Sequence, residues 1–268
     1  MAGRELPRTK VGGLDRRWSR DALWQRSFGA GLALLLGALI LWLALPRLVA
    51  SALLAMRDPV IQRMDTGEQV PEAELLGLIA SRELALGWVE DRETHDEHGT
   101  ALAQLAFREE PQSAAQKATL GRAIRAIRAG LAVAPAAPKD WMQLGYLLVL
   151  LEGDTNRKAA EALLVSIRTG AFQAPDFLRR RLFWSLAHWP FYDGEERRWM
   201  GDQIRAAWRV APGELADLAL HVPDFFAPIA SALERIAGAR EQFVAALAFA
   251  TPVQPALARL DALEHEAD

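Results

Sequence analysis

The sequence predicts an all-α protein with one N-terminal transmembrane helix followed by a solenoid or bundle of helical hairpins. Residues 28–45 form 18 consecutive uncharged positions, and helix-type apolar periodicity recurs along most of the remaining chain. Strand-type alternation is nearly absent. With 51% hydrophobic and 24% charged residues, the roughly 210 residues after the span are enough for one domain with a sizeable core.

The apolar stretch has the dimensions of a membrane span. A helix needs about 20 apolar residues to cross a hydrocarbon layer of about 30 Å. Residues 28–45, extended by the mostly apolar residues 48–56, meet this length. Trp24 and Trp42 stand near its two ends, where tryptophan favours the membrane interface. We therefore expect a transmembrane helix at 28–45.

Charge predicts the orientation of this span. Residues 1–27 carry seven basic and three acidic side chains, a net charge of +4. Since the net charge of the whole chain is −3, the remaining residues carry a net charge of −7. Basic arms stay on the cytoplasmic side, which places the acidic remainder on the far side of the membrane. A cleaved signal peptide, with Ala50-Ser51-Ala52 as its site, is the alternative. The long arm and long apolar run favour a retained anchor.

The span also carries a surface for helix packing. Gly29, Ala33 and Gly37 form a small-residue ridge at i, i+4 and i+8, which predicts a span-mediated dimer or pairing with another span. Cysteine is absent from the sequence. Disulfides, lipid attachment at cysteine and c-type haem attachment are therefore excluded.

Start and stop signals predict the helices of residues 71–212, which follow a connector at residues 46–70. The clearest is the third, in which Leu120, Ile124, Ile127 and Leu131 share one face. Proline, glycine and capping residues set the other boundaries. The expected helices are about 71–88, 97–108, 120–133, 141–152, 156–168, 176–189 and 195–210.

A recurring dipeptide predicts that these helices form a repeat. Ala134-Pro135, Ala174-Pro175 and Ala211-Pro212 are separated by 40 and 37 residues, about one helical hairpin each. Paired helices at this interval indicate a solenoid, because no single unit can bury its apolar face alone. Residues 213–268 are then expected to form a C-terminal helical cap.

One unit resembles a known family. Trp141-Met142-Gln143-Leu144-Gly145 matches the W-x-x-L-G opening of a tetratricopeptide repeat, and Ala160, Leu164 and Pro175 suit its second half. Residues 138–175 therefore resemble one tetratricopeptide unit. The resemblance implies that Gly145 allows close approach of two helices. A non-repetitive helical bundle is the alternative.

The layout as a whole is similar to single-span bacterial envelope proteins with helical repeats. The resemblance implies an inner-membrane protein, cytoplasmic at its N-terminus, whose periplasmic domain is a scaffold binding a protein partner, in exopolysaccharide biosynthesis or export, or in secretion machinery. A chaperone-like adaptor for c-type cytochrome maturation is an alternative. No cofactor is implied, and the acidic exported part disfavours nucleic acid.

The sequence contains none of the common catalytic motifs, so we predict that the protein is not an enzyme. The alternative is a glycan-handling enzyme or a glycan-contacting accessory subunit. A glycosidase needs two carboxylates roughly 5 to 9 Å apart. The adjacent pairs Glu109-Glu110 and Glu195-Glu196 are expected to point to different helix faces, which disfavours this reading.

Three groups of residues are candidates for binding. His95 and His98, at i and i+3, could offer two ligands to a metal, but the run from Glu93 to His98 reads better as a solvated helix start. Arginines along the third helix could hold an anionic partner, and aromatics at a helix end could anchor a protein. The candidate partner-binding residues are Arg122, Arg125, Arg128, Trp189, Phe191 and Tyr192.

Overall fold

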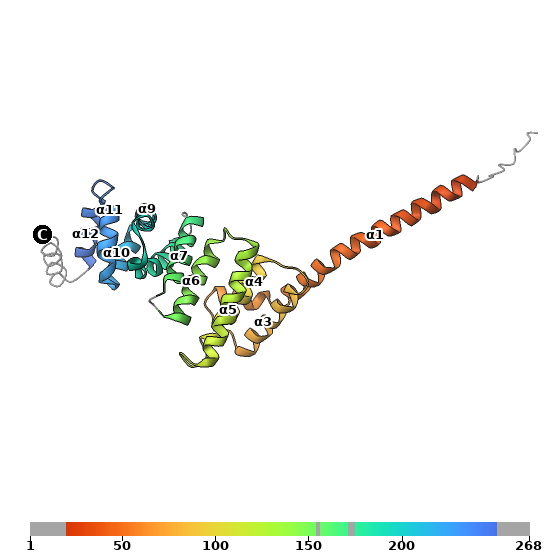
Figure 1. Ribbon diagram of the computed structural model, residues 1–268, viewed down its shortest axis with the longest axis horizontal. Helices are drawn as coiled ribbons and strands as arrows, with labels where there is room; N and C mark the ends of the chain where they lie inside the picture. Colours follow the sequence, from red (N-terminus) through yellow and green to blue (C-terminus); the bar gives the residue numbers. More distant parts are fainter. Residues whose placement is uncertain (1–19, 154–155, 171–174, 251–268) are drawn as a thin grey trace, which may run out of the picture. The chain divides into compact units, whose positions relative to one another are not determined.

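A computed structural model describes residues 20–153, 156–170 and 175–250, in which the regular elements are all helices (Figure 1). This confirms the all-α class for the described part of the chain. The chain divides into two compact units, residues 1–49 and 50–268, which we describe separately.

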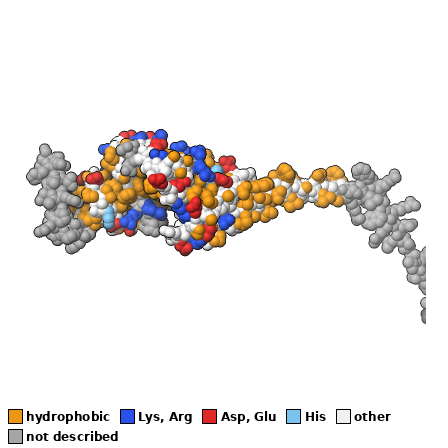
Figure 2. All heavy atoms as spheres, turned by 90° about the horizontal axis from the view of Figure 1, so that it is seen from below, with side chains coloured by type: hydrophobic (Ala, Val, Ile, Leu, Met, Phe, Trp, Pro, Cys, Tyr) orange, Lys and Arg blue, Asp and Glu red, His pale blue; other side chains and the backbone are white. Residues whose placement is uncertain are grey.

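The first unit contains α1 (Arg20–Ala55) as far as Val49, and the last residues of this helix, 50–55, belong to the second unit. From Phe28 onward this helix is long enough to cross a membrane and has a mean hydropathy of 2.4. Apolar side chains cover it on the face shown in Figure 2, and Trp42 is 75% exposed. A helix that is apolar all round is stable only inside protein or lipid. No neighbour lies within 4 Å of a Cβ built at Gly29 or Gly37, so helix pairing through this ridge stays a prediction.

The structure corrects the boundary after the span. Helix α1 continues through Pro46 to Ala55, and α2 (Asp58–Asp65) follows at once. Residues 46–70, predicted to be a connector, are therefore largely helical. Val60 and Met64 of α2 are buried in the core of the second unit because α2 packs against the next helix.

Helices of the first half of the second unit pack in sequence, each against the next. One hydrophobic cluster joins them. They are α3 (Glu72–Leu86), α4 (Arg92–Ala106), α5 (Ala114–Val133), α6 (Pro138–Glu152) and α7 (Arg157–Thr169).

The second half packs differently, because α9 contacts α7, α8, α10 and α11. A second hydrophobic cluster extends from Ala160 to Phe243 across the predicted boundary at residue 212, so the helices of the predicted cap share a core with α8 and α9. Residues 251–268 of that cap lie outside the described part. The elements are α8 (Pro175–Ala187), η1 (Trp189–Phe191), α9 (Gly194–Val210), α10 (Pro212–His221), η2 (Pro223–Phe225), α11 (Phe226–Leu233) and α12 (Ala239–Ala250).

The repeat has a different register from the one predicted. Pro138, Pro175 and Pro212 are the first residues of α6, α8 and α10, at intervals of 37 residues (138 to 175 and 175 to 212). Proline suits this first-turn position because the N–H it lacks would have no helical partner. Pro135, by contrast, lies in the turn after α5. The equivalent dipeptide is Ala137-Pro138, not Ala134-Pro135.

Helix caps follow the same interval. Asn156 caps α7 by accepting from the N–H of Lys158 at 3.0 Å, and Asp193 caps α9 by accepting from the N–H of Glu195 at 2.9 Å. The two caps are 37 residues apart (156 to 193). The hairpins α6–α7 and α8–α9 therefore repeat in both their helix starts and their caps.

Two glycines set the closest approach within the hairpins. A Cβ at Gly145 in α6 would lie 2.8 Å from Leu163 Cγ, and a Cβ at Gly99 in α4 would lie 2.6 Å from Ile127 Cδ1. Both distances are shorter than real contacts allow. The close approach expected at Gly145 is confirmed, and α4 and α5 also approach closely at Gly99.

Candidate functional site

The histidines of α4 are enclosed by neighbouring helices. Asp91 caps α4 by accepting from the N–H of Thr94 at 2.9 Å, so the helix begins at Arg92 and not near Glu97 as predicted. His95 and His98 consequently lie within the helix. His95 and His98 lie four residues and one residue before Gly99, just as Trp141 and Leu144 lie four residues and one residue before Gly145. The two histidines therefore occupy positions that pack against adjacent helices.

This position corrects the expectation of a solvated helix start. Three residues of the run 93–98 contact charged residues of other helices. Glu97 pairs with Arg82 of α3, Asp96 pairs with Lys139 of α6, and His98 Nε2 lies 3.3 Å from Glu83 Oε1 of α3. The polar run was read as exposed because these partners are distant in the sequence.

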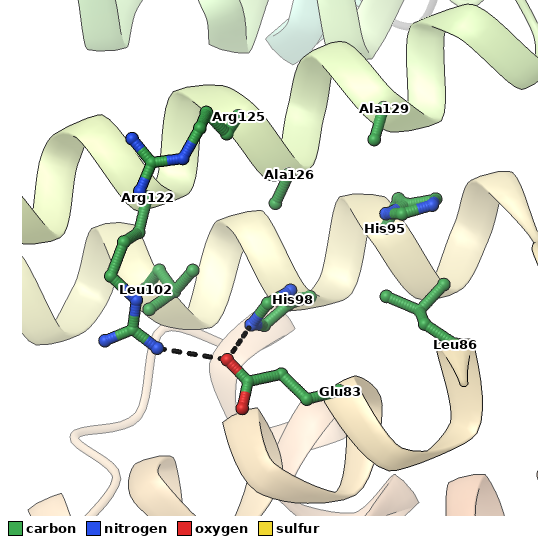
Figure 3. Close-up of a pocket in the computed structure, with 9 residues that line it drawn as sticks. All are labelled: Glu83, Leu86, His95, His98, Leu102, Arg122, Arg125, Ala126 and Ala129. Carbon is green, nitrogen blue, oxygen red and sulfur yellow. Dashed lines mark hydrogen bonds and ion pairs between the residues drawn. The ribbon is translucent and has the colours of Figure 1, made fainter.

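A pocket of about 390 Å³ opens beside the two histidines (Figure 3). Helices α3, α4 and α5 each supply part of its wall, and Leu86, Leu102 and two alanines make one part apolar. The lining residues are Glu83, Leu86, His95, His98, Leu102, Arg122, Arg125, Ala126 and Ala129.

Glu83 is the one carboxylate among these lining residues, and it is already paired. Its Oε1 accepts a hydrogen bond from Arg122 Nη2 at 3.0 Å and lies 3.3 Å from His98 Nε2. Arg125 forms no ion pair with any described residue. The pocket therefore contains one guanidinium group that no carboxylate of the described residues neutralises.

Burial changes the protonation of both histidines. Burial lowers the pKa of His98, and Glu83 partly offsets this effect. Burial also lowers the pKa of His95, against the opposing effect of Glu90 and Asp91. Both ring nitrogens of His95 are shielded from solvent and have no hydrogen-bond partner in the described structure. A buried polar group without a hydrogen-bond partner costs about 1–3 kcal/mol of stability.

Metal binding finds no support in the described residues. In residues 20–153, 156–170 and 175–250, no three His, Asp or Glu side chains are placed so that they could hold a metal ion. His95 and His98 therefore lack the third or fourth ligand that a defined site requires.

Arg82 links the pocket-forming helices to the end of α1. Its side chain is fully buried, and its Nε donates to Glu97 Oε2 at 2.7 Å. Its Nη1 donates to the carbonyl of Leu54 at 3.0 Å, and its Nη2 lies 3.4 Å from Asp58 Oδ1. Sequence analysis missed both Arg82 and Glu83, because one Arg-Glu pair on a helix gives no sign of partners 15 or more positions away.

The structure brings together only part of the predicted partner-binding set. Arg122 and Arg125 line the pocket, whereas Arg128 is exposed outside its lining. Trp189 and Phe191 lie in η1 and are half-buried. Tyr192 is only 2% exposed and packs in the second core cluster, so it is not an accessible anchor as predicted.

Stability should depend on pH through these histidines. Because their folded-state pKa values are lowered, the unfolded chain binds more protons below its own value of about 6.5. Stability from neutral histidine is therefore present above about pH 6.5 and is lost as the pH falls toward the folded-state pKa. We expect His98→Gln to lose less stability than the parent protein between about pH 7.5 and 5.5 in urea unfolding.

His221→Gln is the control, because the His221 side chain is 73% exposed. The stability of this variant should change with pH as the stability of the parent protein does over the same interval. An identical pH dependence for His98→Gln and the parent would contradict the expected role of buried histidine.

No known protein family, curated protein or solved structure matches the chain. The fold defines an all-helical protein in its described part, with one N-terminal helix apolar enough to span a membrane.

Proposed function

We propose that the chain is a single-span protein of the bacterial inner membrane whose helical domain lies in the periplasm and binds a protein partner as an adaptor. The candidate span supports membrane anchoring, and the basic arm at residues 1–27 supports the orientation. The single observation that carries the adaptor role is the α3–α5 pocket, where Arg125, which forms no ion pair with a described residue, lies beside apolar walls.

The architecture is of a kind that serves binding. The helical hairpins recur at an interval of 37 residues, from Pro138 to Pro175. Such hairpins are typical of repeat domains, whose extended surfaces bind other proteins. The tetratricopeptide-like character of residues 138–175 belongs to this proposal. The interval is close to the 34 residues of that repeat.

Binding is favoured over catalysis by the chemistry of the pocket. A glycosidase needs two carboxylates roughly 5 to 9 Å apart, one acting as an acid and the other as a base or nucleophile. Glu83 is the one acidic residue among the described residues that line the pocket, and its carboxylate accepts a hydrogen bond from Arg122.

Photo-cross-linking in cells tests the adaptor role. Benzoylphenylalanine is placed at position 129, on the pocket wall, or at position 209, an exposed position on α9 outside that wall. We expect a discrete protein adduct from position 129 that position 209 does not give, because a partner bound at the pocket contacts only position 129. Full-length protein in the membrane that gives no adduct at position 129 would count against the adaptor role.

A further inference from the structure

We propose that the α3–α5 pocket binds a carboxylate of the partner, held by Arg125 with His95 and His98 beside it. The carboxylate belongs to an Asp or Glu side chain or to a chain end. This inference rests on the proposed adaptor function and names the chemical group that the adaptor recognises.

The ion pairs within the pocket leave one position for an anion. Arg122 donates a hydrogen bond to Glu83 Oε1, and His98 Nε2 lies 3.3 Å from the same oxygen, so Arg122 already neutralises this carboxylate. Arg125 lines the same pocket and has no carboxylate among the described residues. A guanidinium group binds a carboxylate through two parallel hydrogen bonds, which makes a carboxylate a fitting partner for it.

Charge balance favours a carboxylate over a phosphate. Two guanidinium groups and one carboxylate give the pocket a single positive charge, because burial lowers the pKa of both histidines and favours their neutral forms. One carboxylate neutralises this charge. A phosphate monoester carries about −1.5 to −2 at neutral pH and would add repulsion toward Glu83.

The remaining walls suit the rest of an acidic peptide segment. Figure 3 shows the two arginines at one side of the pocket, His95 at the opposite side and His98 between them. Leu86, Leu102 and Ala126 provide apolar surface for an aliphatic stem. The His95 ring adds to the wall opposite the arginines, and both of its ring nitrogens are shielded from solvent in the described structure.

Peptide binding to the full chain in detergent tests the proposal. The probes are acetylated, amidated peptides displayed on a sensor surface, with one internal Glu flanked by leucines or with Gln in its place. A third probe has Gln and a free C-terminal carboxylate, and a fourth has phosphoserine. We expect at least one carboxylate probe to bind about tenfold or more tightly than the Gln amide.

Two variants assign this binding to the pocket. Arg125→Gln should lower the affinity for the preferred carboxylate probe about tenfold. Lys117→Gln removes an exposed cation from the same helix outside the pocket wall and should leave binding unchanged. The Glu and free-carboxylate probes distinguish a side chain from a chain end, and preference for either supports the proposal.

Several outcomes would overturn the inference. The first is equal affinity for the carboxylate and Gln amide probes, and the second is higher affinity for the phosphoserine probe. The third is unchanged affinity for the carboxylate probe in an Arg125→Gln variant whose helical content equals that of the parent. If the adduct at position 129 forms while the peptides fail to discriminate, the carboxylate inference fails and the adaptor role stands. Absence of the adduct contradicts the adaptor role whatever the peptides show.

Discussion

Replacement of Arg82 by methionine is expected to lower the free energy of unfolding by about 3–5 kcal/mol, the usual cost of breaking a buried ion pair by removing one partner. Arg82 is fully buried, and its guanidinium group contacts Glu97, Asp58 and the carbonyl of Leu54. Methionine fills part of the volume but leaves the Glu97 carboxylate without its closest cation. Urea unfolding of the full chain in detergent, followed by tryptophan fluorescence, measures the loss.

Arg179→Met is a matched control for this prediction. Arg179 also contacts two acidic residues, Glu214 at 2.9 Å and Asp217 at 2.5 Å, but its side chain is 48% exposed. Exposed pairs contribute about 0–1 kcal/mol, so the control should lose little stability. Equal losses for the two variants would contradict the buried role of Arg82. Adding Glu97→Leu to Arg82→Met should restore part of the stability, because both charged partners are then gone.

Gly145→Val is the second variant with a large expected effect. A Cβ at this position would lie 2.8 Å from Leu163 Cγ and 3.2 Å from the carbonyl oxygen of Ala159, so α6 and α7 must move apart to accommodate it. Overpacking of this kind costs about 1–3 kcal/mol. The same unfolding measurement would report the loss.

Gly121→Ala shows whether the effect comes from the contact or merely from changing a helical glycine. The nearest atom to a Cβ at Gly121 is Arg125 Nη1, at 3.7 Å, so alanine fits there. Alanine at this position should stabilise the protein by up to about 1 kcal/mol through its higher helix propensity. If the Gly145→Val variant is as stable as the parent protein, the hairpin is not closely packed at Gly145.

Much of the secondary structure could be predicted because its signals are local. The face formed by Leu120, Ile124 and Ile127 predicted α5, and all three side chains are buried. Asn156 and Gly153 mark where α7 begins and α6 ends, and Gly153 has a φ of 93°, a conformation that glycine adopts without strain. Each of these signals depends on residues within one helix or its cap.

Errors arose where two local signals competed. The start of α4 was predicted near Glu97, within a charged run interpreted as a solvated helix start, whereas Asp91 caps the helix at Arg92. The repeat was registered on Ala134-Pro135 because two Ala-Pro dipeptides lie within five residues of one another. Only the observed helix start shows that Pro138 corresponds to Pro175.

The candidate site was only partly accessible to sequence reasoning. Arg122, Arg125 and Arg128 were predicted to bind because they recur along one helix, and His95 and His98 because of their spacing. Glu83 was not selected, although it contacts both Arg122 and His98. The three residues belong to three helices, so no spacing within one helix could relate them.

The sequence by itself determined the candidate span, the all-helical class and most helix boundaries, because hydropathy, periodicity and capping act over one turn or one helix. The tertiary structure alone decided that the α4 histidines are enclosed, that Arg125 has no carboxylate partner among the described residues, and that Arg82 binds the end of α1. These features depend on contacts such as the one between Arg122 and Glu83, which are 39 positions apart. Burial and pairing of charges are properties of packed helices, and a single helix does not contain them.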